Sequence, residues 1–283
     1  MTVWPSDFGG HNWQAMAFSP RTGLVYIPVI KAGERVGPDT EERVRFDPDD
    51  GTGSLLAWDP VAQKKRWEVH YPDSFWNGGT MTTAGDLVFQ GTAGGQFVAY
   101  HAATGQKLWS FDAGLGIVAA PITYEVAGIQ YVSVLVGYGG APNFAGKLFD
   151  TGWRYNEQPR RLLTFALGKR TPLPPSGPPR HRVNAVDDPA LVIDAKQAAR
   201  GFELVEMHCS YCHGNELNDT GSFTPDLRES ALAMNWEAFK SVLHDGSRAT
   251  LGMPKFDNLS DEDLRGIYMY IRQRAREASG PSR

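Results

Sequence analysis

The sequence has few cysteines, no long hydrophobic run and no excess of positive charge. Its 283 residues contain only two cysteines, so a second cysteine pair, as in a four-cysteine zinc site, is absent. No apolar run reaches the roughly 18 residues that span a bilayer, so we expect no membrane-spanning helix. The formal net charge of −4 gives no basic surface for nucleic acid. The first residues, MTVWPSDFGGHNW, lack the basic and apolar regions of a signal peptide.

The chain is long enough for two domains, and its character changes near residue 170. Before that point, short β-branched and aromatic runs alternate with glycine, aspartate and asparagine, which predicts strands and turns. The stretch TPLPPSGPPR then places five prolines within ten residues, which favours an extended spacer. After it the apolar positions follow a helical period. The sequence therefore predicts a β region, a linker and an α-helical region.

The two cysteines lie in the stretch HCSYCHG, where His213 directly follows Cys212. A Cys-x-x-Cys-His run is typical of a covalent haem c site, in which both thiols bond to the porphyrin and the histidine ligates the iron. A zinc site would need further ligands, and a redox dithiol would need a strand before the first cysteine instead of a helix. We interpret Cys209 and Cys212 as haem anchors and His213 as an iron ligand.

A downstream methionine is expected as the second iron ligand, because Met-His ligation raises the potential of a haem used for electron transfer. The candidates are Met234, Met253 and Met269. Met253 is favoured because the glycine and proline of TLGMPKF keep its backbone out of a helix. Met269 falls within the last predicted helix, and Met234 begins a helix-like stretch. His208 and His244 are interpreted as surface residues.

Residues 191 to 276 resemble the small cytochrome c family. They share with it a PDL segment, a GMP segment and a capped final helix, in addition to the Cys-x-x-Cys-His run. The resemblance implies that the carbonyl of Pro225 accepts a hydrogen bond from the free ring nitrogen of His213, a contact that orients the ligand. It also implies that Met253 is the axial ligand.

The β region contains an internal repeat. AWDPVAQKKRW begins at Ala57 and AYHAATGQKLW at Ala99, so alanine and the final tryptophan, Trp67 or Trp109, both recur after 42 residues. This period lies in the range of β-propeller blades. We expect both tryptophans to pack at equivalent places between neighbouring blades, with no catalytic role.

This repeat, together with GGHNWQAMAFSPRTGLVYIP and GIVAAPITYEVAGIQYVSVLVGYGG, resembles the eight-bladed propellers of quinoprotein alcohol dehydrogenases, which bind pyrroloquinoline quinone (PQQ). The order of propeller, proline-rich linker and haem domain is that of the quinohaemoprotein type. The resemblance implies a multi-domain β plus α fold: antiparallel blades of a partial eight-bladed propeller over 1–169, a linker over 170–190, and an all-α cytochrome c domain over 191–283.

The same resemblance implies a function and part of a cofactor site. The haem domain would accept electrons from reduced PQQ, which oxidises a primary alcohol, and pass them to a cytochrome, a blue-copper protein or a quinone. Asn12 and Trp13 match the family's Asn-Trp pair at the edge of PQQ, and Ala141 matches a nearby backbone position.

The family's ligands for calcium or a lanthanide ion, its catalytic base and its adjacent-cysteine disulfide belong to earlier blades. We therefore assign no catalytic residue, and Asp7, Asp73 and Asp86 are interpreted as turn carboxylates. The chain is expected to be the C-terminal part of a longer periplasmic enzyme, with the signal peptide on the missing part. Two alternatives remain: an electron-carrier cytochrome with a β docking domain and no dehydrogenase activity, and a non-enzymatic propeller scaffold, against which the haem motif argues.

Overall fold

The computed structural model describes residues 1–37, 40–42, 49–139, 152–219 and 223–279. These residues form two compact units. The β unit comprises the described residues up to 139 together with 156–178, and the helical unit comprises 152–155 and 179–279. No helix in the described part of the chain is long and apolar enough to cross a membrane. The predicted domain bounds, 1–169, 170–190 and 191–283, stay predictions. The boundary between the two compact units falls within the predicted linker, between residues 178 and 179.

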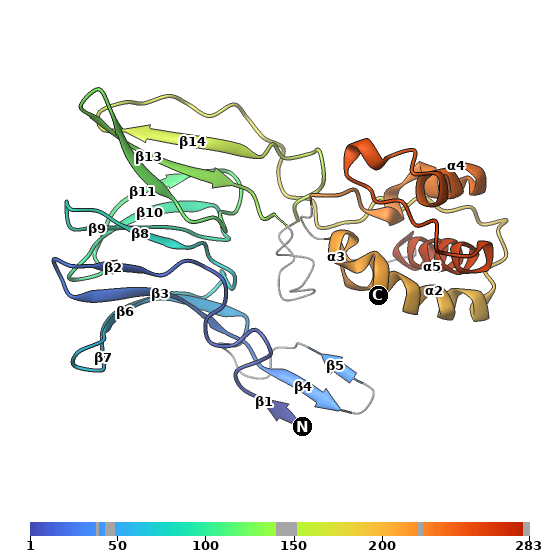
Figure 1. Cartoon of the computed structure of the whole chain (residues 1–283), viewed down its shortest axis with the longest axis horizontal. Coiled ribbons are helices and arrows are strands. Elements are labelled where there is room, and N and C mark those ends of the chain that lie inside the picture. The colour runs from blue at the N-terminus through green and yellow to red at the C-terminus, as the bar shows by residue number, and fades with distance from the viewer. Residues whose placement is uncertain (38–39, 43–48, 140–151, 220–222, 280–283) are drawn as a thin grey trace. The chain divides into compact units, whose positions relative to one another are not determined.

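The β unit consists of antiparallel sheets whose strands follow one another in chain order (Figure 1). The first four-stranded sheet contains β2 (Ala17–Ser19), β3 (Leu24–Lys31), β6 (Thr52–Asp59) and β7 (Lys64–Tyr71). The second contains β8 (Thr80–Thr82), β9 (Leu87–Gly91), β10 (Gln96–His101) and β11 (Lys107–Asp112). A three-stranded sheet follows, with β12 (Ile122–Val126), β13 (Ile129–Val136) and β14 (Arg161–Ala166). A small sheet pairs β1 (Thr2–Val3), β4 (Glu34–Gly37) and β5 (Thr40–Glu42).

The sequence repeat corresponds to a structural repeat. Ala57 pairs with Trp67 across β6 and β7, and Ala99 pairs with Trp109 across β10 and β11. In both sheets the register shifts immediately after the alanine. The two tryptophans therefore occupy equivalent positions, as the 42-residue period predicts.

Each tryptophan packs against the next sheet along the chain. The indole nitrogen of Trp67 donates a hydrogen bond to the carbonyl of Ala102 at 2.9 Å, in the turn that follows β10. The ring of Trp109 lies 5.3 Å from that of Phe165 on β14, measured between centroids. These contacts join successive blades.

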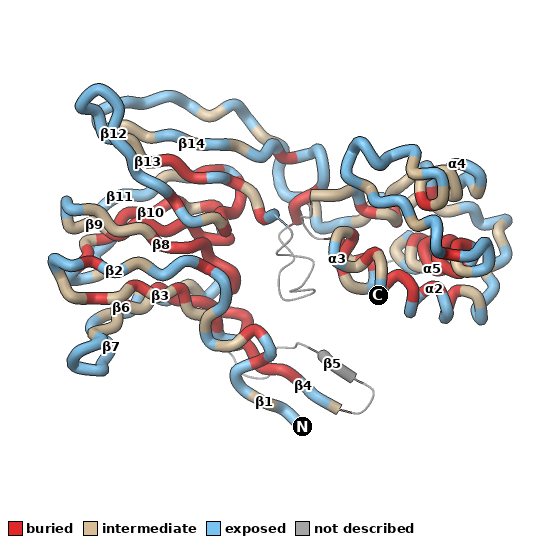
Figure 2. The backbone as a smooth tube through the Cα atoms, viewed as in Figure 1, coloured by how far each residue is buried: buried red, intermediate tan, exposed pale blue. Residues whose placement is uncertain are grey.

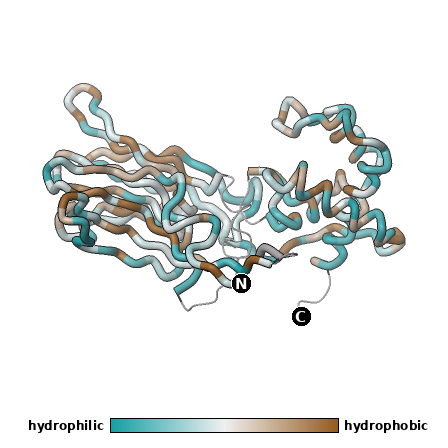
Figure 3. Tube along the Cα trace, turned by 60° about the horizontal axis from the view of Figure 1, so that its bottom comes forward, coloured by the Kyte–Doolittle hydropathy of each residue, from teal (hydrophilic) through white to brown (hydrophobic). Residues whose placement is uncertain are grey.

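One apolar core cluster of the β unit lies between its first two sheets. Burial alternates along β3, which places one face of the strand in this core. Its members are Leu24, Tyr26, Leu55, Ala57, Val88, Val98, Tyr100 and Ala102. The outer strands β7, β11 and β12 are mostly exposed (Figure 2). Hydrophobic stretches alternate with hydrophilic ones within the β unit (Figure 3).

Four α-helices and several short helical turns make up the described helical unit. The α-helices are α2 (Ala195–His208), α3 (Ser210–His213), α4 (Trp236–Lys240) and α5 (Asp261–Ser279). The turns are η2 (Asn215–Leu217), η3 (Leu227–Glu229), η4 (Ala231–Met234), η5 (Ser241–Asp245) and η6 (Ala249–Leu251). The carboxylate of Asp194 caps α2 by accepting from two backbone N–H groups. Ser260 caps α5 reciprocally: its hydroxyl accepts from Asp263 N, and the Asp263 carboxylate accepts from Ser260 N.

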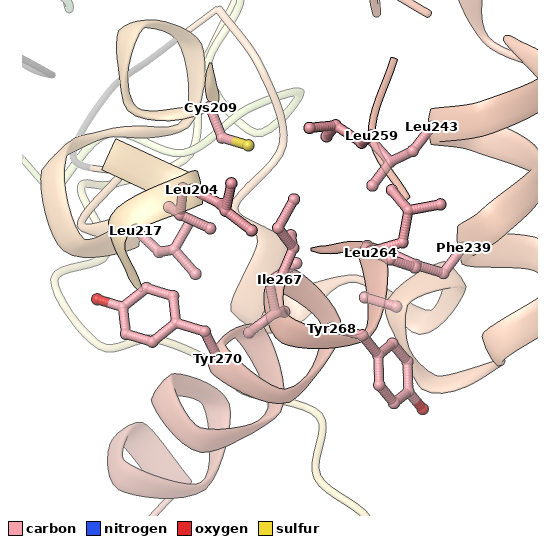
Figure 4. Packing of buried hydrophobic residues seen from close by; sticks show 13 residues of the cluster. Leu204, Cys209, Leu217, Phe239, Leu243, Leu259, Leu264, Ile267, Tyr268 and Tyr270 are labelled. Atoms are coloured by element: carbon pink, nitrogen blue, oxygen red, sulfur yellow. The ribbon is translucent and has the colours of Figure 1, made fainter. Parts of the chain in front are cut away.

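Helices α2 and α5 cross at two glycines, Gly201 and Gly266. Both glycines are buried, and their backbones are so close that a methyl carbon on Gly201 would lie 2.0 Å from the Gly266 carbonyl oxygen. Apolar side chains fill the space around the crossing (Figure 4). The buried cluster comprises Leu204, Val205, Cys209, Leu217, Ala233, Phe239, Leu243, Leu259, Leu264, Ile267, Tyr268, Tyr270 and Ile271.

Candidate haem site

The Cys-x-x-Cys-His run lies where α2 ends and α3 begins. Cys209 is buried in the apolar cluster (Figure 4). Cys212 is half-buried, and the two cysteines do not form a disulfide. Burial, reinforced by Glu206 and Cys212, raises the pKa of the Cys209 thiol to about 12. The chain turns away at Gly214, whose φ of +83° and proximity to the carbonyl of Asn218 require glycine. Cys209 is therefore held in the apolar cluster as a neutral thiol.

His213 has the environment of a metal ligand. Its side chain is buried, and Nδ1 lies 3.0 Å from the carbonyl oxygen of Pro225. Because a carbonyl only accepts, Nδ1 carries the proton and Nε2 keeps a free lone pair. Burial lowers the pKa of this imidazole, which favours the neutral form. Nε2 is buried without a hydrogen-bond partner among the described residues.

An orphaned buried nitrogen of this kind is costly unless a ligand occupies it. The iron of a haem attached at Cys209 and Cys212 would satisfy Nε2 of His213. The residues present therefore fit haem c.

The segment around Pro225 is fixed next to the cysteines. The hydroxyl of Thr224 donates to the carbonyl of Cys212 at 2.5 Å. Asp226 is buried, and its carboxylate accepts from the backbone N–H of Arg228 at 2.9 Å and from that residue's guanidinium at 2.8 and 3.0 Å. The Pro225 carbonyl thus reaches His213 from a loop anchored on both sides.

The three methionines have different surroundings. Met253 follows the left-handed Gly252 at the end of η6 and packs, half-buried, against the apolar cluster. No hydrogen bond to its sulfur is found within the described structure. The sulfur of Met234 already accepts from the guanidinium of Arg272 at 2.7 Å. Met269 packs against the cluster from within α5. Met253 remains the predicted axial ligand, since it lies in a loop and its sulfur is available.

The histidines predicted at the surface are partly exposed. The ring of His208 lies 6.0 Å from that of Phe256, and Nδ1 of His244 lies 3.0 Å from the carboxylate of Asp245. Of the three turn carboxylates, Asp86 forms an ion pair with Arg21 at 2.7 Å. Asp7 and Asp73 are exposed.

The predicted PQQ residues lie partly within the described structure. Asn12 hydrogen-bonds through its amide to the carbonyl of Phe8 and to the backbone N–H of Trp13. Trp13 is 57% exposed, an unusual position for so large an apolar side chain. Ala141 lies outside the described residues. The role of Asn12 and Trp13 at the edge of PQQ stays a prediction.

Two groups of residues gave no recognisable signal in the sequence. Gln14 is 1% exposed, and neither polar atom of its amide has a hydrogen-bond partner among the described residues. Arg154, Asp226 and Arg228 form a buried charged cluster beside Pro225. Single-sequence patterns do not reveal such contacts, because they join segments far apart in the chain.

Comparison with known proteins connects both units to one group of enzymes. Residues 59–132 match the family model described as glucose/ethanol/alcohol dehydrogenase, beta-propeller domain. Residues 196–271 match the model described as cytochrome C oxidase, cbb3-type, subunit III. The fold is therefore a set of antiparallel propeller blades followed by a helical cytochrome c domain, which confirms the predicted fold class.

Among curated proteins, the chain is 42% identical to quinohemoprotein alcohol dehydrogenase ADH IIB of Pseudomonas putida over 98% of its length. It is 38% identical to lupanine 17-hydroxylase [cytochrome c] of a Pseudomonas species. The chain covers 42% and 40% of these two relatives, so it spans about two fifths of their length.

Solved structures give the same result. The quinohemoprotein alcohol dehydrogenase ADHIIG of Pseudomonas putida HK5 matches 98% of the chain with a TM-score of 0.77 at 36% identity, and 43% of that protein is covered. The quinohemoprotein alcohol dehydrogenase of Comamonas testosteroni matches 99% with a TM-score of 0.70 at 35% identity, again with 43% covered. The likeness extends continuously through the blades, the linker and the helices, so the chain belongs to the quinohaemoprotein alcohol dehydrogenase family, as the counterpart of its C-terminal portion.

Proposed function

We propose that this chain is the electron-accepting C-terminal portion of a PQQ-dependent quinohaemoprotein alcohol dehydrogenase. The observation that carries the proposal concerns His213, the histidine of the Cys-x-x-Cys-His run. Its buried Nε2 has no hydrogen-bond partner among the described residues, while Nδ1 contacts the Pro225 carbonyl. The family match over both units supports the same assignment. We further propose that the domains divide at 1–169, 170–190 and 191–283.

Haem c would supply a one-electron carrier to this site. Cys209 and Cys212 would hold it covalently, so the group stays in place through each redox cycle. Nε2 of His213 and the sulfur of Met253 would bind the iron. The apolar cluster excludes water from the site, which reduces the solvent reorganisation that electron transfer requires.

On the β unit, we propose that Asn12, Trp13 and Ala141 contact the edge of PQQ. The base that removes the alcohol proton and the ligands of calcium or a lanthanide would come from blades that the relatives have in the remaining three fifths of their length. The substrate would be a primary alcohol or a related small molecule. The acceptor would be a cytochrome, a blue-copper protein or a quinone, and the enzyme would work in the periplasm.

Paired methionine substitutions test the proposed ligation. In haem-loaded chain, Met253→Ala should abolish the methionine-to-iron charge-transfer band, because it removes the only sulfur proposed to bind iron. Met234→Ala is the matched control and should leave the band unchanged, since the Met234 sulfur already contacts Arg272. Loss of the band in the Met234 variant and its persistence in the Met253 variant would overturn this ligand assignment.

A further inference from the structure

A short segment just before strand β14 belongs to the helical unit. Residues 152–155 lead directly into residue 156 of the β unit, yet they group with the helical unit. Trp153 and Arg154 are 3% and 4% exposed. Gly152 has a φ of +66°, and a methyl carbon on it would lie 2.8 Å from Nε2 of His181. The segment is thus packed closely against the end of the proline-rich linker.

Arg154 joins three parts of the chain that are distant in sequence. Its Nε donates to the carbonyl of Arg180 at 3.0 Å, and Nη2 donates to the carbonyl of His181 at 2.9 Å. Nη1 donates to the carbonyl of Asp219, beyond the cysteine motif. Nη1 also lies 3.5 Å from the carboxylate of Asp226, and both of these side chains are only 4% exposed. A buried guanidinium with this many acceptors fixes all of their positions.

Asp226 connects this cluster to the haem ligand. It directly follows Pro225, whose carbonyl accepts from Nδ1 of His213 at 3.0 Å. A cavity of about 200 Å³ borders both Pro225 and Asp226, together with Arg154. The Pro225–Asp226 segment therefore borders open space on that side. The Asp226 carboxylate is held there by the guanidinium of Arg228 and by the contact with Arg154.

We propose that Arg154 is a positioning residue for the haem: it acts through Asp226 to hold the Pro225 carbonyl against Nδ1 of His213. This inference rests on the proposed function, because it assumes that His213 ligates iron. A firm hydrogen bond at Nδ1 fixes the imidazole ring and increases its basicity toward the metal. The segment that continues into β14 thereby contributes to the electronic state of the haem.

The test follows the His213 Nδ1 proton by NMR in the reduced, haem-loaded full-length chain. In Arg154→Gln, its hydrogen exchange should be about tenfold faster, as expected when a local opening becomes easier by roughly one hydrogen bond. Arg154→Lys keeps the positive charge but cannot engage all four acceptors. In this variant too, the Nδ1 proton of His213 should exchange faster. The midpoint potential of the haem should rise, because a weaker Nδ1 hydrogen bond makes the histidine ligand less basic while the local charge is unchanged.

Arg276→Gln is the matched control. Arg276 also joins the linker to the helices, through the carboxylate of Asp187 and the carbonyls of Asp188 and Leu191, without contacting Pro225 or Asp226. This variant should lose stability with unchanged exchange at His213. Unchanged exchange in the folded Arg154→Lys protein, or equal acceleration in the Arg276 variant, would overturn the proposal. A wild-type chain that binds no haem would instead refute the proposed function.

Discussion

Replacing Gly201 by alanine should destabilise the helical unit, although alanine is the better helix former. The added methyl carbon would lie 2.0 Å from the carbonyl oxygen of Gly266 and 2.4 Å from its carbonyl carbon. Both atoms belong to the backbone of α5, so no side-chain rotation relieves the overlap. Helices α2 and α5 would have to separate by about 1.4 Å to restore a contact of 3.4 Å, the shortest ordinary distance.

Two opposing effects set the magnitude. Removing glycine from a helix interior gains about 1 kcal/mol of helix propensity. Overpacking a close helix crossing costs about 1–3 kcal/mol and occasionally more. The overlap at Gly201 is with rigid backbone and disturbs the apolar cluster on both helices, so the steric cost should lie at the upper end. We expect a net loss of about 2 kcal/mol.

The assay is denaturant unfolding of the haem-loaded chain, followed by far-ultraviolet circular dichroism, because the α-helices described all lie in the helical unit. Ala199→Gly, at an exposed position of α2, is the control. It measures the difference in helix propensity between alanine and glycine without the steric overlap. Gly266→Ala should cost less than Gly201→Ala, because its nearest contact would be 3.2 Å, to the carbonyl of Gln197. A Gly201→Ala chain as stable as the wild type, or more stable, would refute this account of the crossing.

Two further predictions concern pH and activity. Asp263→Asn should lower the stability of the helical unit by up to about 1 kcal/mol at neutral pH, because the Ser260 hydroxyl, followed by Arg200, lowers the pKa of this carboxyl on folding. A carboxyl whose pKa is lowered on folding stabilises the protein at pH values above its ordinary pKa of about 4. This stability is lost as the pH falls through the lowered pKa. Urea titrations from pH 7 to pH 2 should therefore show the stabilities of the wild type and the Asp263→Asn variant converging. Expressed alone and loaded with haem, the chain should be reduced and reoxidised reversibly yet fail to oxidise alcohols with added PQQ and calcium, since no residue of this chain is assigned as the base or as a calcium ligand. Robust alcohol-dependent dye reduction would show that residues of this chain complete the site.

The features that the sequence predicted well are local or periodic. The 42-residue repeat predicted the Ala57–Trp67 and Ala99–Trp109 pairs, since a repeated turn and strand length imposes the same register twice. The spacing of the Cys-x-x-Cys-His run, with the resemblance of the PDL segment, led to the contact between His213 and Pro225. The roles of these residues toward haem and PQQ stay predictions.

The features that were missed depend on distant segments. In the small sheet Thr2 pairs with Arg35. The two residues are far apart in the sequence, and no hydrophobic periodicity indicates that their segments pair. Arg154 lies in a β-rich part of the sequence, yet its partners are carbonyls near residues 180 and 219. A single arginine is usually a solvated surface residue, and only the three-dimensional arrangement shows that this one is buried.

The most direct test of the central claim is the mass of the chain after expression in cells that attach haem to c-type cytochromes. We predict that the denatured chain, extracted with acid acetone, retains one haem, and that digestion places the haem on the peptide containing Cys209 and Cys212. Replacing both cysteines by alanine should leave the chain without haem under the same conditions. A chain with the mass of the bare polypeptide, or a haem lost on extraction, would contradict the assignment of this unit as a haem c domain.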